Sequence, residues 1–212
     1  MIGMTIALMI FMIGLNCYVL CENVEQDTKS DTRYEYMYSL KYPEKEIPKD
    51  AEACYCESLS KTNYGFTLDI TVLGVDDNNP YFDVQVKKVK KGKNKIVISK
   101  SVQQKYNLKI GDKIILADSA NGLDYAFTIE DICDYSASLM VFMDIDSMRE
   151  LFGQEDGYYN VLFTDKLLNI EEGRLYSVTS KKDMWRASEI FTKLMMPLIL
   201  TLTFVSIIMF SV

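Results

Sequence analysis

Two apolar stretches lie at the ends of this chain, and the first reads MIGMTIALMIFMIGLNCYVL (residues 1–20). It contains no Asp, Glu, Lys or Arg. At about 1.5 Å rise per residue, a helix of this length crosses a hydrocarbon core of roughly 30 Å. We therefore predict a first transmembrane helix over residues 1–21.

The second stretch is FTKLMMPLILTLTFVSIIMFSV (residues 191–212), and its single charge is Lys193. A lysine in the first turn of a membrane helix can extend its ammonium toward the headgroups. Pro197 would kink such a helix or mark its first turn, and Trp185, the only tryptophan, suits an interfacial anchor. We predict a second, truncated transmembrane helix over residues 191–212. Neither end has a basic flank that would set orientation, so we expect a fragment of a longer membrane protein.

A cleaved signal peptide or a lipidated leader is the alternative for the first stretch. A signal peptide begins with basic residues and ends with small residues at its cleavage site. No Lys or Arg precedes the apolar run, and bulky Tyr18, Val19 and Leu20 stand before Cys21. These flanks favour a retained helix.

The segment between the two stretches, residues 22–190, is charged and acidic. It holds all 30 Asp and Glu and all but one of the 23 Lys and Arg of the chain. We predict one globular domain of ordinary size. The acidic balance argues against a nucleic-acid partner, because phosphate binding relies on clustered Lys and Arg. The lysine-rich run from Lys87 to Lys95 is the exception; we interpret it as a solvated turn, with a contact to headgroups or an acidic partner as the alternative.

The chain contains no histidine, which excludes serine–histidine and cysteine–histidine catalysis within it. The five cysteines lack the paired spacing of a zinc site. We interpret Cys54 and Cys56 as small buried residues, and a disulfide from one of them to Cys133 as the alternative. Residues 74–80 (GVDDNNP) fail the EF-hand pattern and predict a turn. There is no P-loop motif, and we assign no catalytic residue, metal or cofactor.

Hydrophobic periodicity predicts short strands and two short helices in the domain. The predicted strands are Tyr34 to Tyr42, Ala53 to Leu59, Phe66 to Val75, Lys95 to Ile98, Lys113 to Ala117, Ala126 to Cys133, Leu139 to Met143 and Tyr159 to Phe163. The first helix is capped by Ser99 and runs through Tyr106. The second begins at Asp144 or Asp146 and ends at Gly153. We further expect the helices of both spans to continue into residues 22–29 and 180–186 as stalks. The predicted fold class is a mixed α/β (α+β) extracytoplasmic domain between two transmembrane α-helices.

Three segments, taken in order inside this frame of span, domain and span, carry a family resemblance. They are LDITVLGVD (68–76) with Tyr81 and Phe82, the run from IVISK (96–100) through KIGDKIIL (109–116), and FTIEDI (127–132) leading to VFMD (141–144). Together they resemble the extracytoplasmic domain of an FtsX-like (MacB-like) ABC transporter permease. The segment YEYMYSLKY (34–42) is similar to the entry of the second unit in large Gram-positive permeases.

The resemblance implies a multi-pass protein of the cell membrane without enzymatic activity of its own. Its implied partners are a cytoplasmic ABC ATPase subunit, further permease spans or a second permease copy forming a dimer, and the lipid bilayer. It implies export of lipid, lipoprotein or peptide, or mechanical signalling to an outside partner. A two-span receptor or sensor domain is the alternative, and an ectoenzyme is disfavoured.

By position alone, we expect Glu22, Trp185 and Glu189 to be junctions that transmit motion. The fourteen tyrosines could line a binding face, although ordinary packing is the simpler interpretation.

Overall fold

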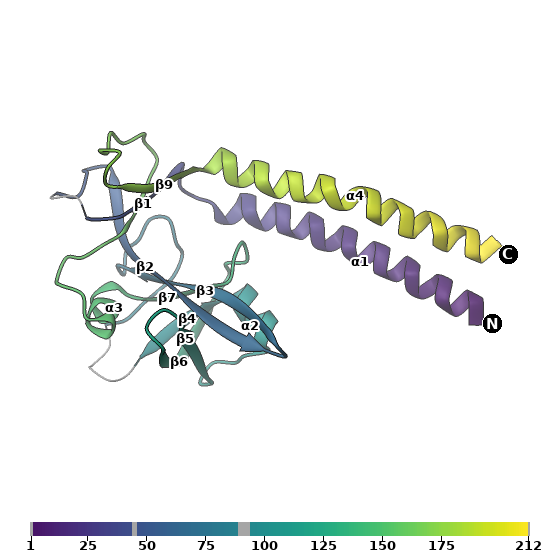
Figure 1. Cartoon of the computed structure of the whole chain (residues 1–212), viewed down its shortest axis with the longest axis horizontal. Helices are drawn as coiled ribbons and strands as arrows, with labels where there is room; N and C mark the ends of the chain where they lie inside the picture. The colour runs from purple at the N-terminus through teal and green to yellow at the C-terminus, as the bar shows by residue number, and fades with distance from the viewer. Residues whose placement is uncertain (1, 44–45, 89–93, 212) are drawn as a thin grey trace. The chain divides into compact units, whose positions relative to one another are not determined.

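The chain divides into two compact units in its computed structural model, which describes residues 2–43, 46–88 and 94–211 (Figure 1). The helix unit comprises Met1–Asp31 and Lys182–Val212, and the domain comprises Thr32–Lys181. The domain contains both strands and helices, and two apolar helices flank it in the sequence. The predicted mixed α/β (α+β) class with an apolar helix at each end is therefore confirmed, and the extracytoplasmic and transmembrane positions stay predictions.

The helix unit consists of α1 (Ile2–Asp31) and α4 (Lys181–Ser211), which run antiparallel with both chain ends on the same side (Figure 1). Both are long and apolar enough to cross a membrane, over Gly3–Asp31 and Lys181–Phe210. Each helix continues beyond its apolar stretch into charged sequence. Pro197 lies inside α4, so the interpretation of Pro197 as a first-turn residue is wrong. The predicted limits of the spans, at residues 21 and 191, stay predictions.

The domain contains nine strands and two short helices in its described part. The strands are β1 (Tyr36–Leu40), β2 (Ala51–Asn63), β3 (Phe66–Val75), β4 (Lys95–Ser99), β5 (Lys113–Asp118), β6 (Leu123–Cys133), β7 (Met140–Asp144), β8 (Val161–Thr164) and β9 (Leu175–Ser180). The helices are α2 (Lys100–Tyr106) and α3 (Ile145–Phe152). All eight predicted strands and both predicted short helices are present, whereas β9 was not predicted.

Six of the strands form a closed sheet. They follow the order β3-β7-β4-β6-β5-β2, and β2 pairs again with β3 along an antiparallel hairpin. The β2–β5 pairing is limited to Ser60 and Ala117. Fully buried aliphatic and aromatic side chains form its core, chiefly Tyr55, Ile70, Val72, Ile98, Leu116, Phe127, Ile129 and Val141.

The remaining strands form what we call the terminal sheet, because it contains the first and last strands of the domain. The start of β2 pairs with β8 from Ala51 to Cys54, and β8, β1 and β9 continue side by side. Tyr38, Leu40, Tyr159 and Leu162 form its small buried core. Strand β2 therefore belongs to both sheets and joins their two cores.

The capping residues predicted from the sequence are confirmed. The backbone N–H of Val102 donates to Ser99 Oγ at 3.3 Å, and that of Ser147 donates to Asp144 Oδ1 at 2.8 Å. Gly153 ends α3 with a φ of +68°, a conformation that glycine adopts without strain. A second glycine permits close packing: a Cβ on Gly74 would lie 2.9 Å from the Met148 sulfur of α3.

Two loop predictions have different outcomes. The turn predicted over residues 74–80 begins only at residue 76, because Gly74 and Val75 are the last residues of β3; in it the N–H of Asn79 donates to the carbonyl oxygen of Asp76 at 3.2 Å. The lysine-rich run falls largely outside the described residues, since residues 89–93 are among those not described. At its start, the ammonium of Lys88 lies 2.8 Å from a carboxylate oxygen of Asp146.

Candidate functional site

The described residues offer little of the chemistry that a metal or a nucleophilic enzyme requires. Within residues 2–43, 46–88 and 94–211, no three His, Cys, Asp or Glu side chains are grouped so that they could hold a metal ion. The cysteines are free thiols, and burial raises the pKa of Cys56 to about 11 and that of Cys54 further. A raised thiol pKa keeps a cysteine protonated and unreactive near neutral pH. The structure therefore supports the interpretation of Cys54 as a small buried residue, whereas Cys56 is only half-buried.

The clearest candidate for a functional site is the strand pair that begins and ends the domain. Strand β1 lies between β8 and β9 and pairs antiparallel with both. Tyr36 faces Ser180 across the β1–β9 pair and Thr164 across the β1–β8 pair. Since α1 ends five residues before β1 and α4 starts directly after β9, the two connections to the helix unit leave from adjacent strands.

A backbone bond and an ion pair fasten the end of this pair. The N–H of Lys181 donates to the carbonyl oxygen of Glu35 at 2.9 Å, and the Lys181 ammonium lies 3.3 Å from Glu35 Oε1. The N–H of Glu35 donates in turn to the carbonyl oxygen of Thr164 in β8 at 3.1 Å. Glu35 thus connects β9 to β8 at the point where the chain enters the domain.

Buried side chains hold the terminal sheet in place behind this pair. Tyr38 is buried, and its hydroxyl accepts a hydrogen bond from the N–H of Leu168 at 2.8 Å. Tyr34, at the entry to the domain, packs its ring on Phe163 of β8 with centroids 4.7 Å apart, and burial raises the pKa of the Tyr34 hydroxyl. Together with the pairing of β1 with β8 and β9, these contacts join the three strands in one connected block.

An asparagine links this block to the closed sheet. The side chain of Asn160 accepts from the N–H of Cys56 and donates to its carbonyl oxygen, both at 2.8 Å. The pairing of β2 with β8 ends at Cys54, and beyond it the Asn160 side chain forms the hydrogen bonds with Cys56 that a neighbouring strand would otherwise form. The sequence contains no pattern that identifies Asn160, because its partner Cys56 lies 104 residues earlier in the chain.

The helix unit has a seam of small residues. Buried positions of α1 recur at a seven-residue interval, at Ala7, Gly14, Cys21 and Thr28. On α4, they recur at Thr192, Ile199 and Ser206. A seven-residue repeat of small residues lets two helices approach closely, as membrane helix pairs do. A Cβ on Gly14 would lie 3.2 Å from Thr203 Oγ1.

Most other apolar side chains of both helices face outward. They include Met4, Leu8, Met9, Met12, Ile13 and Leu20 of α1, and Leu194, Leu198, Leu200, Phe204 and Ile207 of α4. Exposed apolar surface of this extent is typical of a membrane or helix-packing surface. Charged residues lie near the end of α1, where the Lys29 ammonium is 2.7 Å from a carboxylate oxygen of Glu25 and 3.9 Å from one of Glu189 in α4.

The three junction residues expected from the sequence have different surroundings in the helix unit. Glu189 lies near Lys29 of α1 and 3.8 Å from Lys193 of its own helix, so it connects the two helices. Glu22 accepts a hydrogen bond from the Tyr18 hydroxyl at 3.3 Å, within α1. The carbonyl oxygen of Trp185 accepts from the Ser188 hydroxyl at 2.8 Å, within α4. Their roles in transmitting motion stay predictions.

Comparison with known proteins gives structural matches only. No family model matches the chain. No curated protein matches its sequence. Two solved structures are similar to it: the extracellular domain of the noncanonical ABC-type transporter YknZ from Gram-positive bacteria and the periplasmic region of MacB from Actinobacillus actinomycetemcomitans. The YknZ match has 18% identity and a TM-score of 0.37, and covers 62% of this chain and 84% of the other. The MacB match has 9% identity and a TM-score of 0.40, and covers 74% and 93%.

Proposed function

We propose that this chain is a permease unit, or a fragment of one, of an FtsX-like ABC transporter in the cell membrane. The observation that supports this most strongly is the pairing of β1 with β9. Both chain connections to the apolar helices leave the domain from these neighbouring strands. In this proposal, α1 and α4 cross the membrane and the domain of Thr32–Lys181 lies outside the cytoplasm.

The mechanism is a transfer of motion. In this proposal a separate cytoplasmic ATPase subunit binds and hydrolyses ATP; the 212 residues given contain no P-loop motif. Nucleotide binding displaces α1 relative to α4, and the displacement passes through the short connections to β1 and β9. Because β1 is bonded to both β9 and β8, and β8 to β2, a shift at Lys181 reaches the closed sheet through continuous hydrogen bonds.

The proposed permease unit has partners in the membrane and outside it. The outward-facing apolar surfaces of α1 and α4 contact lipid and further permease spans, supplied by a longer version of this chain or by a second copy in a dimer. The moving outer domain expels a lipid, lipoprotein or peptide, or passes a mechanical signal to an outside partner. Glu22, Trp185 and Glu189 are proposed as residues of the transmission path.

Affinity purification of the full chain from its native membranes tests the proposal. We expect a subunit with the G-x-x-x-x-G-K-[ST] motif to co-purify in fixed proportion and to hydrolyse ATP in the purified complex. A variant with Gly-Ser-Gly inserted after Lys181 should retain the subunit but uncouple hydrolysis from the outer domain. The same insertion after Ala120, in an exposed turn, is the matched control. Purification without any such ATPase would leave the alternative, a two-span receptor.

A further inference from the structure

The tip of the β2–β3 hairpin has an unusual composition. Its two-residue loop, Tyr64-Gly65, has φ angles of +50° and +80°, and Asn63 pairs with Phe66 across it. Loops of this kind favour Asn-Gly, because both central residues need positive φ. A tyrosine is a poor choice at the first position on conformational grounds. Tyr64 as a whole is 93% exposed, so burial in the domain does not explain the presence of a tyrosine here.

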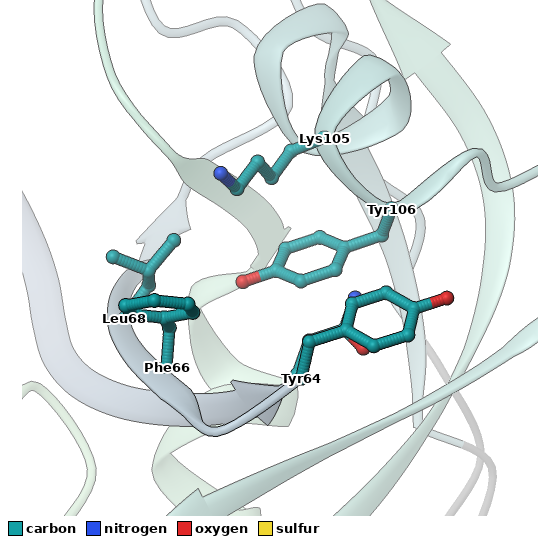
Figure 2. A pocket seen from close by; sticks show the side chains of 6 residues that line it. Tyr64, Phe66, Leu68, Lys105 and Tyr106 are labelled. Atoms are coloured by element: carbon teal, nitrogen blue, oxygen red, sulfur yellow. The ribbon is translucent and has the colours of Figure 1, made fainter.

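This tip forms one wall of a pocket of about 510 Å³, and α2 forms the other. The pocket is lined by Asn63, Tyr64, Phe66, Leu68, Lys105 and Tyr106. Figure 2 shows the Tyr106 ring extending from α2 toward Phe66 and Leu68, with the Tyr64 ring beside it. Three aromatic rings and a leucine thus surround a space of the size that small-molecule sites have.

The polar groups at this pocket point to the charge of its ligand. The Tyr106 hydroxyl oxygen is buried and has no hydrogen-bond partner among the described residues. Lys105 lines the pocket, and the Lys61 ammonium lies 5.6 Å from the centroid of the Tyr106 ring. Across the described ranges, no carboxylate forms an ion pair with either lysine. The Lys61 ammonium also donates to the carbonyl oxygen of Ile115 at 3.5 Å, which leaves its charge without a carboxylate. In a chain of net charge −7, two lysines without ion-pair partners around Tyr106, whose hydroxyl is unused, favour an anionic group.

We propose that this pocket binds a small amphipathic carboxylate. The apolar body, an aromatic ring or short alkyl chain, packs among Tyr64, Phe66 and Leu68. The carboxylate accepts hydrogen bonds from the Tyr106 hydroxyl and the Lys105 ammonium, and Lys61 adds positive charge above the Tyr106 ring. A single carboxylate suits these two donors, since its two oxygens can accept several hydrogen bonds at once. The site does not depend on the proposed permease function.

Fluorine NMR of the full chain in zwitterionic lipid nanodiscs tests this site. Tyrosines are replaced by fluorotyrosine, and the Tyr64 and Tyr106 signals are assigned from Tyr64→Phe and Tyr106→Phe. We expect phenylbutyrate to shift both signals saturably. Phenylbutyramide, which has the same ring and chain without the charge, should bind at least about tenfold more weakly, because charge-assisted hydrogen bonds are lost. Empty nanodiscs correct for partitioning of both compounds into lipid.

Matched variants separate charge from general apolar binding. Lys61→Gln combined with Lys105→Gln should reduce phenylbutyrate affinity about tenfold and leave that of the amide unchanged. Lys109→Gln, an exposed lysine that does not line the pocket, should have no effect. The signals of buried Tyr38 and Tyr55 verify that each variant is folded. Equal affinity for acid and amide, or no saturable shift at Tyr64 and Tyr106, would overturn the proposal.

Discussion

Lys181 donates its backbone N–H to the carbonyl oxygen of Glu35 at 2.9 Å and places its ammonium 3.3 Å from the Glu35 carboxylate. These two residues are 146 positions apart in the sequence, at opposite ends of the domain. One precedes β1 and the other follows β9, so the pair holds together the two points at which the chain enters and leaves. Both chain connections between the apolar helices and the domain therefore leave from this region.

Reversing one charge of this pair should loosen the terminal sheet. We expect Glu35→Lys to destabilise the domain by about 0.2–1 kcal/mol, the usual range for a partly exposed ion pair. The double variant Glu35→Lys/Lys181→Glu should recover most of that loss. Urea unfolding of the singles and the double measures the coupling. Glu46→Lys, at an exposed position outside the pair, is the control. Strict additivity of the two single effects would mean that the side chains do not interact.

A large side chain at Gly14 should separate the two helices. A Cβ atom added at this position would lie 3.2 Å from Thr203 Oγ1 and 3.7 Å from the carbonyl oxygen of Ile199. We expect Gly14→Leu to destabilise the helix unit by roughly 1–3 kcal/mol, as overpacking does. Thermal unfolding in detergent measures the loss. Gly3→Leu should be neutral, because nothing lies within 4 Å of its Cβ position. Equal effects of the two substitutions would show that no close seam exists at Gly14.

Replacing Tyr64 should stabilise the domain while it damages the pocket. Asparagine tolerates a φ of +50° better than tyrosine does, and Asn-Gly is the preferred pair for this loop. We expect Tyr64→Asn to raise stability by up to about 1 kcal/mol. It should also weaken phenylbutyrate binding, because an aromatic wall is removed. Tyr176→Asn, at another highly exposed tyrosine, should give no such gain. A stability loss at Tyr64→Asn would contradict the conformational argument.

Glu52 should make stability depend on pH. Burial raises the pKa of Glu52, and the nearby charge of Asp76 raises it further. A raised pKa in the folded state means that protonation favours folding: the contribution is complete below the ordinary glutamate pKa and is lost as pH rises through the folded value. Glu52→Gln should therefore raise the melting temperature at neutral pH and have no effect in acid. A melting-temperature difference that is constant with pH would contradict this.

Local sequence signals predicted much of the domain. The caps at Ser99, Asp144 and Gly153 depend on neighbouring residues only, and the structure has all three. Strand β3 has the predicted limits because its apolar run lies between turn residues. The apolar stretches at the chain ends predicted α1 and α4 by length and composition alone.

The parts that matter most for the proposed mechanism had weaker signals. Strand β9 lies at the edge of its sheet with its central residues exposed, so it shows no buried face in its sequence. The pocket unites residues 63–68 with residues 105 and 106, and only the folded chain brings them together. The same holds for Glu35 with Lys181, whose partnership follows from sheet order and not from any local pattern.

Hydrogen exchange of the purified complex with its ATPase subunit shows whether β1 and β9 transmit the motion of the helices. Amide protection is compared between the nucleotide-free state and the state trapped with ATP and vanadate. We expect protection to change at Tyr36–Leu40 and Leu175–Ser180, while β4 and β6 in the closed sheet keep their protection. Unchanged exchange at β1 and β9 in a complex that is hydrolysing ATP would contradict the claim that this strand pair transmits the motion.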